Sequence, residues 1–273
     1  MKKAKILIVS LFFPFMMFSQ TNEEKVNVVK MEGAINFRDI GGYKTQDGKT
    51  IVTGKLFRSA DISKLTNNDM KIMEENHIYT VIDFRGKKES AAAPDRLLPN
   101  TDYTLCPSGS DNIPDTKKLA ELVKDDNFLL SMYNSQSIRY YGERYKPMFQ
   151  KLLSLPESNS SLLYHCTGGR DRTGMATALL LYVLGVPMKT IETDFVASNI
   201  YLTPVNKEMF KPMVQLSGFS ESEIEERMKL RPELIRSFFK SISDEYGSIE
   251  NFMEKELGVG NKEIAFLKQK YTK

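Results

Sequence analysis

One short segment of this 273-residue chain combines residue types that can bind and attack a phosphate group. In order, the segment contains Cys166, Thr167, Gly168, Gly169, Arg170, Asp171 and Arg172. Glycines permit unusual backbone dihedrals, so successive N–H groups of such a loop can converge on an anion. The fork of Arg172 can hold two phosphoryl oxygens, and the same positive groups lower a thiol pKa below its free value of about 8.5. The pattern therefore predicts a Cys166 thiolate beneath a bound phosphate.

The residues on either side of this segment predict how it is positioned. Residues 161–165 predict a short strand, and residues 173–184 predict a helix that is apolar on most sides and buried. A loop between a strand and a helix N-terminus gains the positive potential of that terminus. The alternative is that Cys166 is a core cysteine in an ordinary turn, but the arginine and the two glycines disfavour it.

The string His-Cys-x5-Arg-Thr-Gly, which begins at His165, resembles the active-site signature of the protein tyrosine phosphatase superfamily. The whole string to Gly174 is similar to bacterial tyrosine/serine phosphatases related to a secreted mycobacterial phosphatase with activity on lipids. The resemblance extends to residues 36–43, 56–60, 83–85 with Glu89, 246–248 and 257–259. It covers the chain from about residue 30 to its end.

This resemblance implies a two-step reaction without metal or cofactor. Cys166 would attack phosphorus to give a phosphocysteine, and water would then release phosphate. Arg172 and the loop amides, from Thr167 through Arg170 and Asp171, would stabilise the phosphoryl oxygens. Thr173 would donate its hydroxyl to the departing sulfur, and His165 would support the loop. The implied substrates are phosphotyrosine proteins or peptides, with phosphoserine, phosphothreonine and phosphoinositides as further candidates.

The general acid that protonates the leaving group stays open at this point. Asp171 lies within the loop, as in the bacterial subfamily, and Asp111 follows a short strand, where related phosphatases place a mobile acid. Asp83 is a weaker third candidate, because a structural pair with Arg85 or Arg58 explains it as well. Arg170 stands where relatives that accept phosphoinositides carry lysine, so it would read a second phosphate or pair with a nearby acid.

Other functions compete with catalysis. A catalytically silent protein that binds phosphorylated ligands, a sulfurtransferase and a purely structural exported domain are the alternatives. The second cysteine, Cys106, is either a buried strand residue or a resolving thiol for Cys166. With two histidines in the chain, the sequence predicts no metal cluster.

The first residues predict export to the periplasm or secretion. Lys2, Lys3 and Lys5 precede an apolar run over residues 6–18, which is the layout of a signal peptide over residues 1–19. Residues 20–35 predict a flexible lead-in. Removing the leader takes away three lysines and brings the net charge of +3 close to zero, which disfavours nucleic acid as a partner. No stable membrane span is expected after cleavage.

The remaining pattern predicts an α/β fold over residues 36–273. Strands are expected near residues 50–57, 79–84, 103–105 and 161–165, with a helix over 66–76 and one long or broken helix over 127–155 between them. The pattern of residues 188–273 predicts helices throughout. We therefore expect one domain, with a central parallel-rich sheet flanked by helices and a helical C-terminal extension.

Overall fold

The computed structural model describes residues 27–273 except residue 113. The expected signal peptide over residues 1–19 lies outside the described residues, as does the lead-in up to residue 26. The rest of the lead-in contacts the domain, because the backbone N–H groups of Glu32 and Gly33 donate to the buried carboxylate of Asp69. Within the described residues, no helix is both long enough and apolar enough to cross a membrane.

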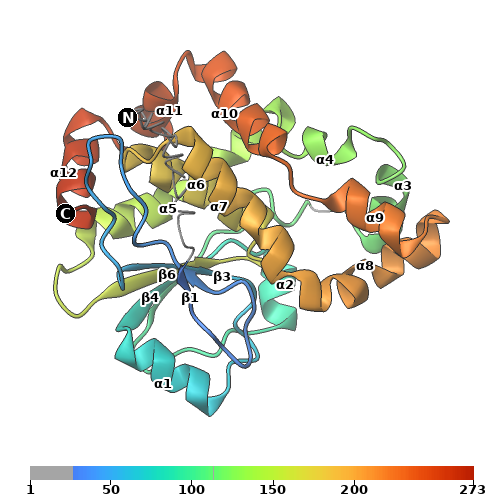
Figure 1. The fold of residues 1–273 in the computed structure, drawn as a ribbon, viewed down its shortest axis with the longest axis horizontal. Coiled ribbons are helices and arrows are strands. Elements are labelled where there is room, and N and C mark those ends of the chain that lie inside the picture. Colours follow the sequence, from blue (N-terminus) through green and yellow to red (C-terminus); the bar gives the residue numbers. More distant parts are fainter. Residues whose placement is uncertain (1–26, 113) are drawn as a thin grey trace, which may run out of the picture.

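A six-stranded mixed sheet forms the centre of the molecule, in the order β1-β2-β3-β6-β4-β5 (Figure 1). Strands β3, β6, β4 and β5 are parallel, and β1 and β2 are antiparallel to their neighbours. The strands are β1 (Asn27–Val28), β2 (Arg38–Asp39), β3 (Leu56–Ser59), β4 (Ile78–Asp83), β5 (Asp102–Leu105) and β6 (Ser161–His165). The predicted fold class, a parallel-rich sheet flanked by helices, is confirmed.

Helices cover the sheet and then dominate the second half of the chain. They are α1 (Asn67–Glu75), α2 (Lys87–Ala92), α3 (Thr116–Leu122), α4 (Phe128–Ser131), the 3₁₀ helix η1 (Ser135–Tyr140), α5 (Tyr141–Ser154), α6 (Asp171–Val183), α7 (Met188–Tyr201), α8 (Thr203–Ser217), α9 (Glu221–Met228), α10 (Pro232–Tyr246), α11 (Ile249–Leu257) and α12 (Asn261–Tyr271). Over residues 127–155, where one long helix or a broken one was expected, the structure has the broken form, with α4, η1 and α5. The helical C-terminal extension is present.

The two faces of the sheet bury different sets of apolar side chains. Successive residues of a strand point to opposite faces, and Leu162 and Leu163 of β6 accordingly enter different cores. The smaller core includes Phe57 and Met73 and lies on the side of α1. The larger core lies under α5, α6 and the C-terminal helices (Figure 1). Strand β6 is therefore buried on both faces, which fixes the residues that follow it.

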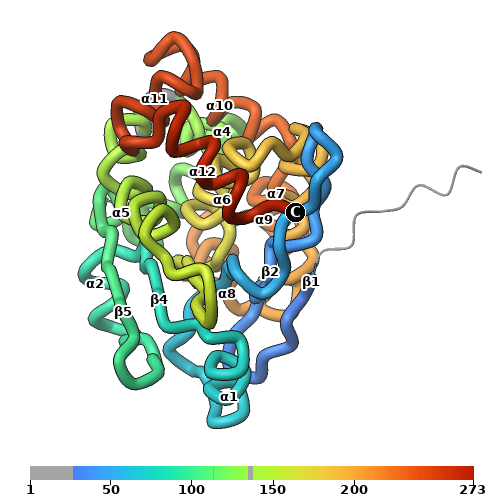
Figure 2. The backbone as a smooth tube through the Cα atoms, turned by 90° about the vertical axis from the view of Figure 1, so that its left-hand side faces the viewer, coloured from blue at the N-terminus to red at the C-terminus, as the bar shows by residue number. Residues whose placement is uncertain are grey.

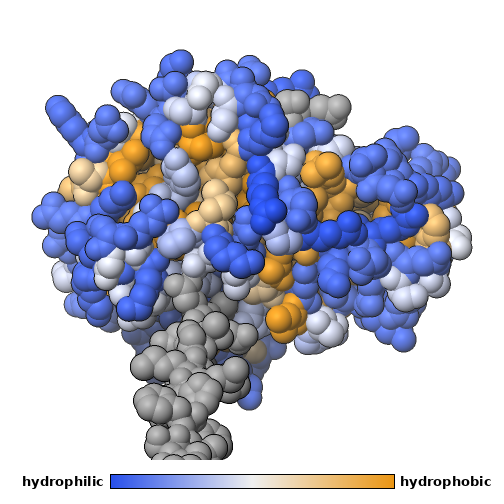
Figure 3. Space-filling view, turned by 45° about the horizontal axis from the view of Figure 1, so that its top comes forward, coloured by the Kyte–Doolittle hydropathy of each residue, from blue (hydrophilic) through white to orange (hydrophobic). Residues whose placement is uncertain are grey.

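The C-terminal helices close back onto the main body of the fold. After α12, Thr272 forms a bridge with Ile51, so the chain end lies beside an early segment (Figure 2). Helices α3, α8 and α9 enclose a separate small apolar cluster that includes Phe210 and Ile224 (Figure 1). The face drawn in Figure 3 is mostly hydrophilic, with separate apolar areas between the charged groups.

Candidate active site

Cys166 lies immediately after the central strand β6, at the carboxyl end of the parallel strands. Its side chain is buried, with the residue 2% exposed. Burial opposes the charged thiolate, but the positive charge of Arg172 and interactions with the hydroxyl and N–H of Thr173 outweigh it and lower the pKa of Cys166. Asp171 opposes this effect. The balance favours a reactive thiolate at this position.

Thr173 is placed to interact with that sulfur rather than with other protein groups. The residue is fully buried in the first turn of α6, and its Oγ1 makes no hydrogen bond with a nitrogen or oxygen of the described residues. The next turn is fixed differently, because Thr177 Oγ1 donates to Thr173 O at 2.8 Å. The Thr173 hydroxyl is therefore available to Cys166.

Arg172 is held by a carboxylate that comes from a different part of the chain. Its Nη1 and Nη2 donate to the two Glu89 oxygens at 2.7 and 2.9 Å, and Nη1 also donates to Phe84 O at 3.1 Å. Burial raises the pKa of Glu89, but Arg172 outweighs this effect and lowers that pKa to about 2. Glu89 also accepts the hydroxyl of Thr167 at 2.6 Å. This bidentate pair fixes the plane of the guanidinium.

The backbone of the loop is held by side chains from the N-terminal strands. Asn36 Nδ2 donates to Gly168 O at 3.1 Å and to Gly169 O at 2.9 Å, and Arg58 Nη2 donates to Gly169 O at 2.8 Å. Gly169 has a φ of +60°, and a Cβ there would lie 2.3 Å from Ser59 O. Only glycine fits this close approach to the end of β3. At Gly168, in contrast, a Cβ would make only an ordinary contact, 3.7 Å from Arg170 Cβ.

A buried ionic group lies behind these contacts. Asp194 of α7 receives Arg58 Nη1 at 2.5 Å, Arg38 Nη2 at 3.3 Å and the Tyr43 hydroxyl at 3.1 Å. Burial raises the pKa of Asp194, but the two guanidinium groups outweigh it and lower that pKa. We call Asn36, Arg38, Arg58 and Asp194 the buried network. It leaves one excess positive charge beneath a loop that is suited to an anion.

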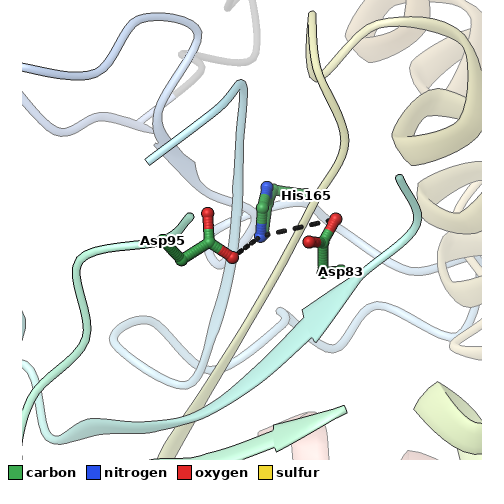
Figure 4. Close-up of side chains that lie close together, drawn as sticks. All are labelled: Asp83, Asp95 and His165. Carbon is green, nitrogen blue, oxygen red and sulfur yellow. Dashed lines mark hydrogen bonds and ion pairs between the residues drawn. The ribbon is translucent and has the colours of Figure 1, made fainter. Parts of the chain in front are cut away.

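His165 is buried beneath the loop, in a second cluster of charges. Its Nε2 lies 3.1 Å from Asp95 Oδ2 and 3.8 Å from Asp83 Oδ1 (Figure 4), and its Nδ1 lies 3.4 Å from Cys166 O. Burial lowers the pKa of His165, but the two carboxylates outweigh it and raise that pKa. His165 thus supports the loop from below, as a positioning role requires.

The same cluster includes a guanidinium that already balances the carboxylates. Asp83, Asp95 and His165 lie close enough together to hold a metal ion. However, Arg85 Nη2 donates to Asp83 at 2.8 Å and to Asp95 at 2.7 Å, and Arg85 Nη1 donates to Asp61 at 2.5 Å. We therefore interpret the group as a structural ion cluster. Asp83 is fully buried in it, which fits the structural alternative for this residue.

The two candidate acids differ in their partners. Asp171 Oδ1 accepts the hydroxyl of the fully buried Tyr133 at 2.5 Å and lies 3.4 Å from Arg170 Nε. Arg170 itself is buried and donates to Met228 O at 2.6 Å, so its side chain reaches toward α9. The carboxylate of Asp171 is thus held in place by Tyr133 and Arg170.

Asp111 is exposed and makes no hydrogen bond or ion pair with the described residues. Its loop is nevertheless fixed next to Arg172, because Ser110 Oγ donates at 2.7 Å to Phe84 O, the carbonyl that Arg172 also uses. The Asp111 carboxylate lies directly over Gly86, where a Cβ would approach it to 2.5 Å. Asp111 therefore lies at the rim of the same site.

Cys106 and Cys166 are both buried free thiols, with no disulfide between them. Burial and the nearby Asp83 raise the pKa of its thiol to about 12. Its backbone N–H donates to Asp83 O at 2.7 Å, which continues the pairing of β5 with β4. These features fit the prediction of a buried strand residue, and a thiol of this kind is a poor nucleophile.

Several residues that hold the loop were not assigned a role from the sequence. Asp61, Asp95, Tyr133 and Asp194 stand outside the blocks that resemble the superfamily, and nothing in the local sequence of the last three indicates a site. The roles of Asn36, Arg58 and Glu89 were also missed, although each lies in one of those blocks. A search for polar residues at the ends of parallel strands would have found Arg58 and Asp61.

Residues 29–273 match the model of the tyrosine phosphatase family. A protein of Cupriavidus necator named as a candidate tyrosine-protein phosphatase is 25% identical over 82% of this chain and 82% of its own length. The triple specificity protein phosphatase PtpB of Mycobacterium tuberculosis is 25% identical over 83% of this chain and 92% of its own length.

A tyrosine-protein phosphatase of Nostoc commune is 26% identical over 77% of this chain and 72% of its own length. These relatives come from distant bacteria, and each aligns with most of the chain, so the similarity is not confined to the signature loop. The family match likewise spans the sheet, the loop and the C-terminal helices. The protein therefore belongs to the tyrosine phosphatase family and is a phosphoric monoester hydrolase of that type.

Proposed function

We propose that this protein hydrolyses phosphotyrosine esters in two steps through a phosphocysteine on Cys166. In the first step the sulfur forms a bond to phosphorus while the bond from phosphorus to the tyrosine oxygen breaks. In the second step water attacks phosphorus, the sulfur–phosphorus bond breaks, and inorganic phosphate leaves. The observation that carries the proposal is the buried Cys166, with its lowered pKa, beside the guanidinium of Arg172.

We propose Asp111 as the acid that gives a proton to the leaving oxygen and receives one from water in the second step. Asp171 has Oδ1 engaged by Tyr133 and close to Arg170, whereas Asp111 is exposed and unengaged at the rim. In this assignment Asp171 shapes the loop. The aryl leaving group of p-nitrophenyl phosphate needs little protonation, so loss of the acid should affect it less than a phosphotyrosyl peptide.

Kinetics of three variants test both statements. Cys166→Ser should abolish hydrolysis of p-nitrophenyl phosphate and of a phosphotyrosyl peptide. Asp111→Asn should reduce peptide hydrolysis by about 100-fold or more, within the range for general acids, and should remove the descending limb of the pH profile. Asp171→Asn should retain that limb. If Asp171→Asn loses it and Asp111→Asn keeps it, the assignment of the acid is wrong.

The range of substrates is a separate part of the proposal. One relative is named a triple specificity phosphatase, so phosphoseryl and phosphothreonyl peptides and phosphoinositides belong in the same assay. We propose phosphotyrosine as the preferred substrate, because the buried Arg170 points to Met228 O rather than serving as a free cation for a second phosphate. A higher kcat/KM on a phosphoinositide than on phosphotyrosyl peptides would contradict this preference.

Export is a further proposal, which rests on the basic start and apolar run of residues 1–19. The leader would be removed, so that the mature protein acts in the periplasm or outside the cell. N-terminal sequencing of protein recovered from that compartment tests this: a mature start shortly after Ser19 supports it. Recovery of the full chain with Met1 from the cytoplasm alone would contradict it.

A further inference from the structure

Three consecutive carbonyl groups of the phosphate-binding loop are held from outside. Thr167 O accepts the backbone N–H of Asp61 at 3.0 Å, Gly168 O accepts Asn36 Nδ2, and Gly169 O accepts both Asn36 Nδ2 and Arg58 Nη2. In a planar trans peptide, the C=O and the N–H point in opposite directions, and the described chain has no cis peptide. The next three N–H groups therefore face away from these holders.

Those three N–H groups belong to Gly168, Gly169 and Arg170. None of them makes a hydrogen bond within the described part of the chain. A row of N–H groups that point the same way, without protein acceptors, is the arrangement that binds an anion. The orientation of this row thus depends on what holds the carbonyls on the opposite side.

Asn36 holds two of the three carbonyls, and its amide can face only one way. Arg38 donates to Asn36 Oδ1, and a guanidinium has no acceptor atom, so the oxygen must face it. The Asn36 amide nitrogen is then left to donate to Gly169 O at 2.9 Å and Gly168 O at 3.1 Å, with a longer contact to Ser198 Oγ at 3.3 Å. The residue is buried and has a φ of +56°, a left-handed conformation that asparagine tolerates better than most residues.

We propose that Asn36 is a positioning residue that turns the Gly168 and Gly169 peptide planes so that the N–H groups of Gly169 and Arg170 face the phosphate. Asn36 does not touch the substrate in this account. Its effect reaches both the resting enzyme and the bound state, because the same N–H groups stabilise the Cys166 thiolate and the phosphoryl oxygens. The inference deepens the proposed function and rests on it for the identity of the anion.

The test measures anion binding and thiolate formation in addition to turnover. Asn36→Asp keeps the size of the side chain and the acceptor for Arg38, but removes both N–H donors and turns an oxygen toward the two carbonyls. We expect the pH midpoint for alkylation of Cys166 by iodoacetamide to rise. We expect the inhibition constant for inorganic phosphate to rise, and kcat/KM to fall, by about 10- to 100-fold, as for other residues that orient ligand groups.

Other groups near Cys166 also influence that midpoint, and the comparison must hold them constant. Arg172, Thr173 and Asp171 act on the thiol directly. His165 precedes it in the chain, and the buried Tyr145 is close enough to interact with its charge. The Asn36 variants leave all five in place. Peptide mass spectrometry separates Cys166 from Cys106, whose raised pKa makes it an unreactive internal reference.

A second variant and a matched control keep the test decisive. Asn36→Gly removes the amide but retains freedom at positive φ, so it replaces Asn36→Asp if the latter does not fold. Asn100→Asp changes another asparagine with a positive φ, in the turn before β5, and should leave every measurement unchanged. Melting temperatures are recorded for all variants.

The inference is overturned if the folded Asn36 variants keep the alkylation midpoint and phosphate inhibition of the wild type. It is also overturned if they lose activity only in proportion to a lower melting temperature, since a purely structural role would give that result. Failure of the wild-type protein to hydrolyse any phosphate ester would instead contradict the proposed function. The alkylation midpoint would still test the role of Asn36, because alkylation does not need turnover.

Discussion

The loop from Cys166 to Arg172 is held on two sides by groups of different character. On one side, the pair formed by Glu89 and Arg172 is partly exposed, with the Glu89 side chain 31% accessible. On the other side, the buried network of Asn36, Arg38, Arg58 and Asp194 is closed to solvent. The exposed pair includes Arg172, the residue that would bind phosphate, whereas the buried network orients the backbone of the loop. We infer that the exposed side tunes catalysis and that the buried side maintains the shape of the loop.

The largest effect is expected from breaking the buried network at its carboxylate. Asp194→Ala leaves Arg38 and Arg58 buried without their shared counter-charge, which costs about 3–5 kcal/mol when one partner of a buried ion pair is removed. Urea denaturation of the wild type and the variant measures this loss. The matched control is Asp244→Ala, because Asp244 pairs with Lys240 on an exposed helix face. Such a surface pair contributes only about 0–1 kcal/mol, and equal losses in the two variants would contradict the comparison.

A smaller effect on stability but a clear effect on catalysis is expected at Glu89. Glu89→Gln keeps the shape and removes the charge that fixes Arg172, so kcat/KM should fall by about 10- to 100-fold, as for groups that orient a ligand-binding residue. Steady-state kinetics measure this change. Glu75→Gln, at the exposed end of α1, is the control and should behave as the wild type. Unchanged kinetics in Glu89→Gln would show that the charge of Glu89 is not needed to orient the Arg172 guanidinium.

The pH dependence of stability separates the two sides further. The folded pKa of Glu89, about 2, lies below its ordinary value of 4.5, so its contribution to the free energy of unfolding is fully present above pH 4.5. That contribution is lost as the pH falls from 4.5 toward 2. The difference in unfolding free energy between wild type and Glu89→Gln should therefore shrink over this window. A difference that stays constant with pH would contradict the lowered pKa.

The smallest effect is expected from the hydroxyl that holds Asp171. Tyr133→Phe removes one hydrogen bond to a carboxylate and keeps the ring packed against Phe195. We expect kcat/KM to change by about 10-fold or less, since one such bond contributes about 0.5–1.5 kcal/mol, or somewhat more to a charged group. Tyr182→Phe is the control, because its hydroxyl donates to Glu250 at the same 2.5 Å on a distant helix. A loss as large as that of Asp111→Asn would show that Asp171 is the acid.

The sequence predicted the groups that act within one segment better than the groups that hold the segment. Cys166, Arg172 and Thr173 share a loop and a helix start, so their proximity follows from spacing alone. Strand β6 was predicted with the bounds that the structure shows, because Leu162, Leu163 and Tyr164 form a short apolar run directly before the loop. Thr66, where the helix over 66–76 was expected to start, is the N-cap of α1, with Asp69 completing a capping box.

The missed features depend on contacts between distant residues. Asn36 and Asp194 are 158 positions apart, and no local pattern indicates that they support one loop. Helix α2 was missed because its six residues form no apolar face. Its position is fixed by Glu89, which accepts the N–H of Gly86 and pairs with Arg172. A break between α4 and α5 was one of two expected forms, but its place was not predicted, because the apolar spacing continues across η1.

The central claim is that the Cys166 sulfur itself receives the phosphoryl group. The most direct measurement is mass spectrometry of protein that is quenched in acid during turnover of a phosphotyrosyl peptide. We expect one added phosphoryl group on the wild-type peptide that contains Cys166, and none on the corresponding peptide of Cys166→Ser. Hydrolysis at the normal rate by Cys166→Ser, or a phosphoryl group found on another residue, would contradict it.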